Sequence, residues 1–363
     1  MSIGQHIITE RFYGAKSHTI DNVDIVLSRE CGENTLAVVR INNALYQLLV
    51  NDDGKDVLND HVEEVGASFG AWTGSSAFPI GPFTPLGTEQ SNSSFITADN
   101  KAIVKYFRKL ESGQNPDVEL ISKISSCPNI APILGFSSAE ISGANYTLVM
   151  AQQYIPGLDG WSHALTTTSG SFAEDAEKIG EATRNVHTAL ASAFPTRVVP
   201  VEALADALTT RLNELISQAP EIARFKEAAI DLYQSLEGDT HIQRIHGDLH
   251  LGQLIKTPER YILIDFEGEP ARPLNQRRLP DSPLKDLAGI IRSIDYAAYF
   301  DGEHTQWANE ATALFLDGYG SIEDQELLNA YILDKALYEV AYEINNRPDW
   351  VKIPLEAVER LLD

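Results

Sequence analysis

Two motifs in the second half of the chain decide the fold, HGDLHLGQ at residues 246–253 and IDFEGEP at residues 264–270. The first contains Asp248, and a carboxylate near an acceptor hydroxyl can orient it and take its proton during phosphoryl transfer. Gln253 offers an uncharged oxygen, and Asp265 follows a short apolar strand, so both can hold Mg²⁺. The motifs predict a kinase-type centre with Asp248 as the base and Gln253 and Asp265 as metal ligands.

A structural interpretation of the same residues has to be considered, because an aspartate in a His-Gly-Asp turn is usually only a turn residue. Two aspartates and a glutamine at strand or loop boundaries seldom occur together by chance, and this favours the catalytic interpretation. His246 fits a buried hydrogen-bonding prop better than an acid or base. His250 is a candidate to face the substrate or to be structural, and Glu267 is a further candidate for the substrate site.

Upstream, Lys105 lies in AIVKYF (102–107), a strand-like run where a lysine can contact the α- and β-phosphates of a nucleotide. Glu119 is its expected ion-pair partner, early in a helix that Asn115 caps and that runs to about Cys127. Asp117, in the first turn of that helix, suits the helix dipole. The alternative is a lysine that points to solvent, as most do. The downstream motifs favour the Lys105–Glu119 pair. A basic cluster adds positive charge here: Lys101, Lys105, Arg108 and Lys109.

A phosphate-binding loop is less clear, because the sequence contains no GxGxxG. EQSNSS (89–94) lies between two candidate strands, and its amides and hydroxyls can bind phosphate, although such a turn is more often only a turn. The residues expected at the phosphates are Ser91, Asn92, Ser93 and Ser94. The segment after Met150, with Gln153 and Tyr154, is expected to hold the adenine.

Composition narrows the class of protein. The chain has 363 residues, 43% of them hydrophobic, and a net charge of −24. The length suits two domains, and the charge disfavours nucleic acid and anionic membranes as partners. Two distant cysteines, Cys31 and Cys127, are typical of reduced thiols in a cytoplasmic protein. The first residues do not read as a signal peptide, and no run approaches the length of a membrane span.

The pattern along the chain predicts an α+β protein. Residues 23–28 and 36–50 read as strands, and 66–87 as a linker or long loop. A capping box at 171–174 opens a helix, and further helices are expected near 201–217 and 220–236. We therefore predict a β-rich part at 1–87, a small α+β part at 88–155 and a mainly helical part at 156–363.

The quoted motifs resemble the aminoglycoside-phosphotransferase-like kinases, which have a His-Gly-Asp-x-His core and an Ile-Asp-Phe/Trp-Glu metal segment. Within them the chain looks most like the actinobacterial maltokinases, and actinobacterial glucosamine kinases share the same core. Besides the two central motifs, the matching stretches are RFYGAK (11–16), EQSNSS (89–94), NPDVEL (115–120), PDSPLKD (280–286), LDKALYE (333–339) and NRPDW (346–350).

The resemblance implies a bilobal eukaryotic-like kinase fold whose N-terminal cap packs on the ATP lobe. It implies that the three predicted parts are an N-terminal cap at 1–87, a small ATP-binding lobe at 88–155 and a helical lobe with the catalytic and sugar-binding site at 156–363. It implies ATP and Mg²⁺ as cofactors and phosphorylation of maltose to maltose 1-phosphate, which feeds α-glucan and glycogen synthesis. A maltose-producing trehalose synthase is then a possible partner. The cap is shorter than expected of a maltokinase, which leaves its role open.

Candidates for sugar contact gather near the C-terminus, where aromatic and polar residues occur together. Asp334, Tyr338 and Tyr342 are spaced to share one helix face, and Arg347 and Trp350 follow. The alternative is that the tyrosines pack in the core and Arg347 caps the helix.

Two other functions compete with the maltose kinase. A glucosamine or other amino-sugar kinase would use the same catalytic residues with a different sugar pocket. A catalytically inactive, nucleotide-binding pseudokinase would bind a nucleotide without turnover, but the full set of Lys105, Asp248, Gln253 and Asp265 argues against it.

Overall fold

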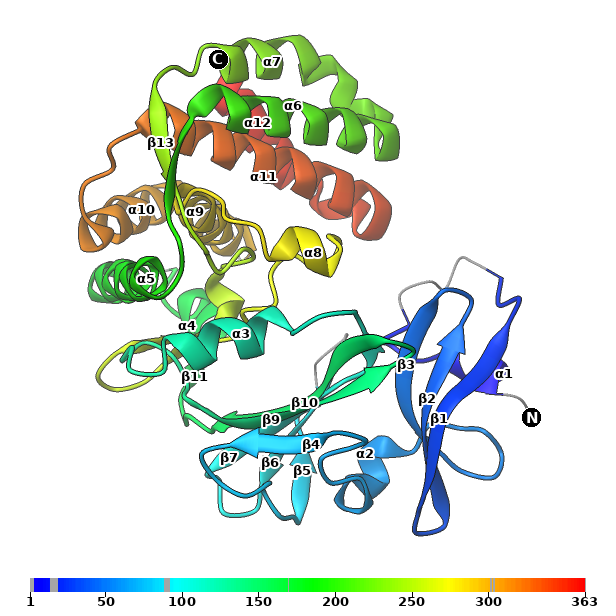
Figure 1. Cartoon of the computed structure of the whole chain (residues 1–363). Helices are drawn as coiled ribbons and strands as arrows, with labels where there is room; N and C mark the ends of the chain where they lie inside the picture. Colours follow the sequence, from blue (N-terminus) through cyan, green and yellow to red (C-terminus); the bar gives the residue numbers. More distant parts are fainter. Residues whose placement is uncertain are drawn as a thin grey trace. The chain divides into compact units, whose positions relative to one another are not determined.

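The computed structural model describes residues 3–13, 19–87, 92–168, 170–300, 302 and 304–362. It divides into two compact units, which we describe separately (Figure 1). Unit 1 comprises Met1–Ser126, Ala131–Ile155 and Arg272–Gln276, and unit 2 comprises Cys127–Ile130, Pro156–Ala271 and Arg277–Asp363. Unit 1 takes in both the predicted cap and the predicted small lobe, so their separation at residue 87 stays a prediction.

The first sheet of unit 1 is antiparallel, with the strand order β1-β2-β3-β8. Its strands are β1 (Val23–Cys31), β2 (Asn34–Ile41), β3 (Ala44–Val50) and β8 (Lys109–Leu110). Asn42, with a φ of 50°, makes the tight turn between β2 and β3, a backbone region that asparagine tolerates better than most residues. Val39 and Leu48 belong to a core that also includes Ile7 of α1 (Ile3–Ile7) and Tyr13.

The second sheet of unit 1 has the order β4-β9-β10-β7-β6-β5. Its strands are β4 (Ala71–Gly74), β5 (Phe83–Pro85), β6 (Asn92–Thr97), β7 (Ala102–Phe107), β9 (Ile133–Ile141) and β10 (Ala144–Gln153). The prediction of a linker or loop at 66–87 is therefore wrong in part, because β4 and β5 lie within it at the two edges of this sheet. An edge strand can be short and can contain a proline, here Pro85, without losing a ladder hydrogen bond.

Short helices complete unit 1: α2 (Leu58–His61), the 3-10 helix η1 (Val62–Glu64) and α3 (Pro116–Lys123). The predicted cap of α3 is confirmed, since Asn115 accepts a hydrogen bond from the Asp117 amide at 2.8 Å. The helix ends at Lys123, earlier than the predicted Cys127.

Gln47 and Arg108 join the two sheets of unit 1. The Gln47 side chain donates to the carbonyls of Phe107 and Leu148, each at 3.2 Å. Arg108 is 1% exposed, donates to the Gln47 carbonyl at 3.0 Å and pairs with Asp56 at 2.6 Å. Arg108, predicted to add positive charge to a basic cluster, is thus paired with Asp56 and holds the two sheets together.

Unit 2 is mainly helical. Its helices are α4 (Gly160–Leu165), α5 (Ala173–Ala193), α6 (Val201–Gln218), η2 (Pro220–Phe225), α7 (Lys226–Gln234), η3 (Leu251–Gln253), α9 (Leu284–Phe300), α10 (Thr305–Tyr319), α11 (Gln325–Asn346), η4 (Pro348–Trp350) and α12 (Lys352–Leu362). The short α8 (Leu274–Arg277) begins in the segment assigned to unit 1 and ends in unit 2.

Two small antiparallel sheets lie in unit 2, β11-β14-β15 and β12-β13. Their strands are β11 (Leu158–Asp159), β12 (Arg197–Pro200), β13 (Asp239–Ile242), β14 (Leu254–Lys256) and β15 (Tyr261–Leu263). The hairpin of β14 and β15 separates the two central motifs, so that each motif begins or ends at a strand.

Helices α5 and α10 pack closely against each other (Figure 1). The predicted capping box before α5 is not formed as such, because the helix begins at Ala173 and its amide reaches the Ser171 hydroxyl only at 3.4 Å. The approach of the two helices depends on glycine. A Cβ on Gly180 would lie 2.1 Å from the Phe315 carbonyl oxygen, and a Cβ on Gly318 would lie 2.1 Å from that of Glu177.

Among the described residues, no helix combines the length and the apolar character needed to cross a membrane.

The contact between α5 and α10 can be tested by adding one methyl group. We expect Gly180→Ala and Gly318→Ala each to lower the free energy of unfolding by about 1–3 kcal/mol, because the helices have to separate. Alanine is the better helix former by about 1 kcal/mol, so a loss of stability reports the clash. Gly87→Ala is the control, because no atom lies within 4 Å of its added Cβ. Thermal and urea unfolding measure the effect, and unchanged stability in both helix variants would contradict this packing.

Candidate active site

Asp286 of α9 anchors the predicted catalytic loop. Its two carboxylate oxygens accept the backbone amides of His246 and Gly247, each at 2.8 Å. The imidazole of His187, on α5, lies 2.9 Å from the same carboxylate. Burial alone would raise the pKa of Asp286, but these hydrogen bonds and the nearby histidines lower it. Asp286 thus holds an ionised carboxylate under the loop that presents Asp248.

The predicted structural role of His246 is confirmed. The side chain is 1% exposed, its Nε2 lies 2.9 Å from the Ile264 carbonyl, and its ring packs 4.7 Å from that of Phe266. The ring therefore ties the catalytic loop to the metal segment. Gly247 has a φ of 87°, a conformation that favours glycine.

Asp248, the predicted base, pairs with Lys335 of α11. The Lys335 ammonium lies 3.1 Å from Oδ1 of Asp248, and the side chains are 24% and 20% exposed. Burial would lower the pKa of Lys335, but the carboxylates of Asp248, Glu269 and Glu339 raise it above its ordinary value. Lys335 is thus a stable cation beside the candidate base.

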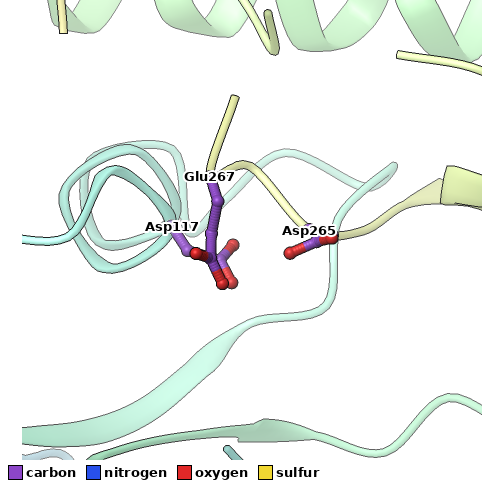
Figure 2. A group of neighbouring side chains, drawn as sticks. All are labelled: Asp117, Asp265 and Glu267. Atoms are coloured by element: carbon purple, nitrogen blue, oxygen red, sulfur yellow. The ribbon is translucent and has the colours of Figure 1, made fainter. Parts of the chain in front are cut away.

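The predicted metal ligands of unit 2 lie together. The Gln253 amide nitrogen is 3.1 Å from Oδ2 of Asp265, and a carboxylate oxygen of Glu267 lies within 4.8 Å of one of Asp265 (Figure 2). Asp265 has a φ of 63°, an uncommon conformation for a residue other than glycine and one that often marks a functional site.

These three side chains fit Mg²⁺, which prefers oxygen ligands and carboxylates in particular. The Gln253 amide would have to turn its oxygen toward the ion, which a flip of the terminal torsion achieves. Glu267 lies beside Asp265, and its predicted contact with the substrate stays a prediction. It is a candidate third ligand.

On the nucleotide side, Lys105 is not the solvent-exposed lysine of the structural alternative. It lies in β7, its side chain is 10% exposed, and its Nζ is 3.3 Å from Oδ2 of Asp117. Asp117 projects from the first turn of α3 (Figure 2) and its side chain is 2% exposed. The sequence interpretation had placed Asp117 only as a favourable charge at the helix start. The predicted role of Glu119, two residues on, stays a prediction.

The predicted phosphate loop differs from the structure. Asn92, Ser93 and Ser94 belong to β6 rather than to a turn, and Ser91 lies outside the described residues. The Ser93 hydroxyl accepts a hydrogen bond from Arg108 at 3.1 Å. The backbone of these residues pairs antiparallel with β7, and Ser94 lies opposite Lys105. The predicted turn at 92–94 is therefore wrong, while contact of these residues with phosphate stays a prediction.

Gln153 is the last residue of strand β10, and Tyr154 follows it. The Gln153 amide donates to the Pro132 carbonyl at 2.8 Å, and the Tyr154 amide donates to the Lys101 carbonyl at 2.9 Å. These bonds fix the backbone at the end of the strand, while contact with adenine stays a prediction.

His250 has a structural role in unit 2. Its Nδ1 accepts the Gly252 amide at 3.1 Å and so caps η3, the turn that carries Gln253. Burial lowers the pKa of His250, so this ring favours the neutral form that can accept the bond. Of the two interpretations left open for His250, the contacts support the structural one.

The predicted sugar residues divide into two groups. Asp334 is 5% exposed and lies 3.3 Å from Arg211 of α6. The centroid of the Tyr338 ring is 5.2 Å from the Arg211 guanidinium and 5.4 Å from the Lys335 ammonium. Tyr342 is 44% exposed, so the exposure of the helix face that carries these residues increases from Asp334 toward the end of α11. These residues line α11 as predicted, and their contact with a sugar stays a prediction.

The second group surrounds Arg347, which directly follows α11. Its guanidinium makes two hydrogen bonds to Glu343, at 2.6 and 2.9 Å, and lies 4.9 Å from the Trp350 ring. Glu343 is 1% exposed and also accepts the Tyr296 hydroxyl at 3.1 Å. These contacts agree with the alternative in which Arg347 closes the helix end.

Arg211 is the ion-pair partner of Glu269, and the sequence analysis does not identify it. It binds Glu269 of the metal segment through two hydrogen bonds, at 2.5 and 2.8 Å. Burial would raise the pKa of Glu269, but Arg211 lowers it to about 2. With Asp248, Asp334 and Lys335, the pair lines a cavity of about 20 Å³, enough for one water molecule.

The comparisons with known proteins give this site its context. No family model matches the sequence. A glucosamine kinase from Mycolicibacterium smegmatis is 25% identical over 317 residues, which cover 77% of this chain and 79% of the relative. A glucosamine kinase from Streptacidiphilus jiangxiensis is 26% identical over 330 residues, 78% of this chain and 74% of the relative. Both of these relatives of the chain are glucosamine kinases.

Solved structures agree on the fold. A glucosamine kinase (crystal form B) matches with a TM-score of 0.74 at 19% identity, over 99% of both chains. A glucosamine kinase in complex with glucosamine, ADP and inorganic phosphate matches with a TM-score of 0.71 at 19% identity, also over 99% of both. The predicted α+β kinase-like fold is confirmed.

Both curated relatives are glucosamine kinases, so the predicted branch of maltokinases is not supported, and membership of the aminoglycoside-phosphotransferase-like superfamily stays a prediction. The predicted enzyme class, a phosphotransferase with an alcohol acceptor, is confirmed. ATP as a cofactor agrees with the ADP and phosphate of the solved glucosamine kinase, and Mg²⁺ is the standard metal of such kinases.

The Arg211–Glu269 ion pair makes the free energy of unfolding depend on pH in the acidic range. The pKa of Glu269 is about 2 in the folded chain and ordinarily 4.5, so its stabilising contribution is complete above about pH 4.5 and is lost as the pH falls toward 2. We expect Glu269→Gln to lose less stability across this window than the unmodified chain. Exposed Glu227→Gln is the control. Urea unfolding from pH 5 to pH 2.5 measures the slopes, and equal slopes for all three chains would contradict the assignment.

Proposed function

We propose that this chain is an ATP-dependent sugar kinase whose acceptor is glucosamine or a related amino sugar. The observation that carries the proposal is its similarity to two glucosamine kinases along more than three quarters of its length. The fold shared with the solved glucosamine kinases and the loop anchored by Asp286 support it.

The roles of the residues follow from their positions. Asp248 orients the acceptor hydroxyl and takes its proton, and the loop amides bound to Asp286 fix its backbone. Gln253, Asp265 and Glu267 would hold Mg²⁺, which when bound neutralises the negative charge of the phosphates. Lys105, oriented by Asp117, would contact the phosphates.

Maltose, the acceptor predicted from the sequence, is the competing candidate. The motif resemblance favours it, whereas the similar proteins along the chain are glucosamine kinases. A net charge of −24 also favours a cationic acceptor over a neutral one by long-range attraction. The sequence alone predicts a link to glycogen synthesis, a trehalose synthase partner and a cytoplasmic location, and all three stay predictions.

An acceptor panel separates the candidates. ADP release is measured with glucosamine, N-acetylglucosamine, glucose, maltose and an aminoglycoside, at saturating MgATP. We expect kcat/KM for glucosamine to exceed that for N-acetylglucosamine and maltose by at least about 100-fold, as for a site built to bind a polar group that the poorer substrate lacks. Turnover of maltose without glucosamine would overturn the proposal in favour of the maltokinase.

The role of Asp248 has its own test. We expect Asp248→Asn to lower kcat by about 10²–10⁴-fold, because an amide cannot accept the hydroxyl proton. The Kd for ATP, measured by calorimetry, should change little, since this residue is assigned to the acceptor. Exposed Asp231→Asn on α7 is the control. An active Asp248→Asn enzyme would remove the residue from this role, and an inactive wild type that binds ATP would identify a pseudokinase.

A further inference from the structure

Lys335 lies beside the candidate catalytic carboxylate and has no part in the roles assigned so far. We propose that Lys335 is a positioning residue for phosphoryl transfer: it binds Oδ1 of Asp248 and thereby directs Oδ2 to the acceptor hydroxyl. The inference rests on the proposed role of Asp248 and deepens it.

The geometry gives this contact a direction. An ammonium group can only donate hydrogen bonds, so the 3.1 Å contact makes Oδ1 of Asp248 the acceptor. The second oxygen stays available to accept a proton. Among the described residues, Lys335 is the one cation that forms an ion pair with Asp248. A carboxylate side chain otherwise rotates freely between positions, and one charged hydrogen bond selects one of them.

The surroundings hold the ammonium in place. Lys335 projects from the middle of α11, whose residues Leu333, Ala336 and Leu337 are fully buried. The Tyr338 ring lies 5.4 Å from its Nζ. The backbone of Lys335 is therefore fixed by packing that does not involve Asp248.

Neighbouring carboxylates do not draw Lys335 away from Asp248, because each has an arginine of its own. Glu269 is held by Arg211 through two hydrogen bonds, and Glu339 accepts Arg292 at 2.8 Å. Both carboxylates still favour the charged form of Lys335 through the electrostatic field. They support the cation, and its hydrogen bond goes to Asp248.

A purely structural ion pair between α11 and the loop is the competing explanation. It would stabilise the fold without affecting the chemical step in particular. The chain offers a matched control for this case: Lys256, whose Nζ lies 2.6 Å from Asp175 and whose side chain is 27% exposed, compared with 24% for Lys335.

The test compares Lys335→Met with Lys256→Met, using the acceptor of highest turnover in the panel, or water where no sugar reacts. We expect Lys335→Met to lower kcat by about 100-fold, the cost of a slightly misplaced catalytic group, with the Kd for ATP unchanged. Lys335→Arg should recover part of kcat, because it restores the charged donor. Lys256→Met should keep kcat and lose only thermal stability.

A double-mutant cycle then asks whether Lys335 acts through Asp248. If it does, the variant with both Lys335→Met and Asp248→Asn is no slower than Asp248→Asn alone. Multiplicative losses, or a kcat of Lys335→Met within about threefold of wild type, would overturn the inference. The choice of acceptor does not enter this cycle, so a failed amino-sugar proposal and a failed role for Lys335 give different results.

Discussion

The two hydrogen bonds from the His246 and Gly247 amides to the Asp286 carboxylate fix the geometry on which the rest of unit 2 depends. Amides in a turn have no ladder partner, and an ionised carboxylate satisfies two of them at once. His187 joins the same carboxylate from α5. Three elements distant in sequence thus meet at one buried charge, and the loop that carries Asp248 gains a fixed backbone.

Other buried charges of unit 2 also form ion pairs. Arg211 forms ion pairs with Glu269 and Asp334, and Arg292 forms one with Glu339. Removing one partner of such a pair leaves a buried charge that costs about 3–5 kcal/mol, whereas the intact pair adds little net stability. These pairs are weak evidence for stability. Their more direct consequence is geometric, since they fix the side chains around the candidate base.

The part of the site that could be predicted from the sequence is the part fixed by local spacing. Asp248, Gln253 and Asp265 lie within two short motifs joined by one hairpin, so their order along the chain places them together. Asn115 could be recognised as a cap for the same reason. The fold class followed from these motifs more than from periodicity, which did not reveal edge strands as short as β4.

The residues that the sequence did not reveal act over long separations. Lys335 meets Asp248 across 87 positions and Arg211 meets Glu269 across 58, and no spacing rule relates such residues. Asp117 was misjudged for a different reason. The helix dipole stabilises any acidic side chain in the first turn, so the sequence explains the charge of Asp117 without a contact to Lys105.

This division explains why the reaction class is easier to establish than the acceptor. Phosphoryl transfer needs a few groups in one arrangement, and two motifs supply most of them. Sugar recognition is spread over side chains of separate helices, where one substitution changes a hydrogen bond without disturbing the fold. At 25% or 26% identity to glucosamine kinases, the catalytic loop can be shared while the residues along α11 differ. The acceptor therefore cannot be inferred from the catalytic motifs, and the residues along α11 that the sequence predicts for sugar contact need a test of their own.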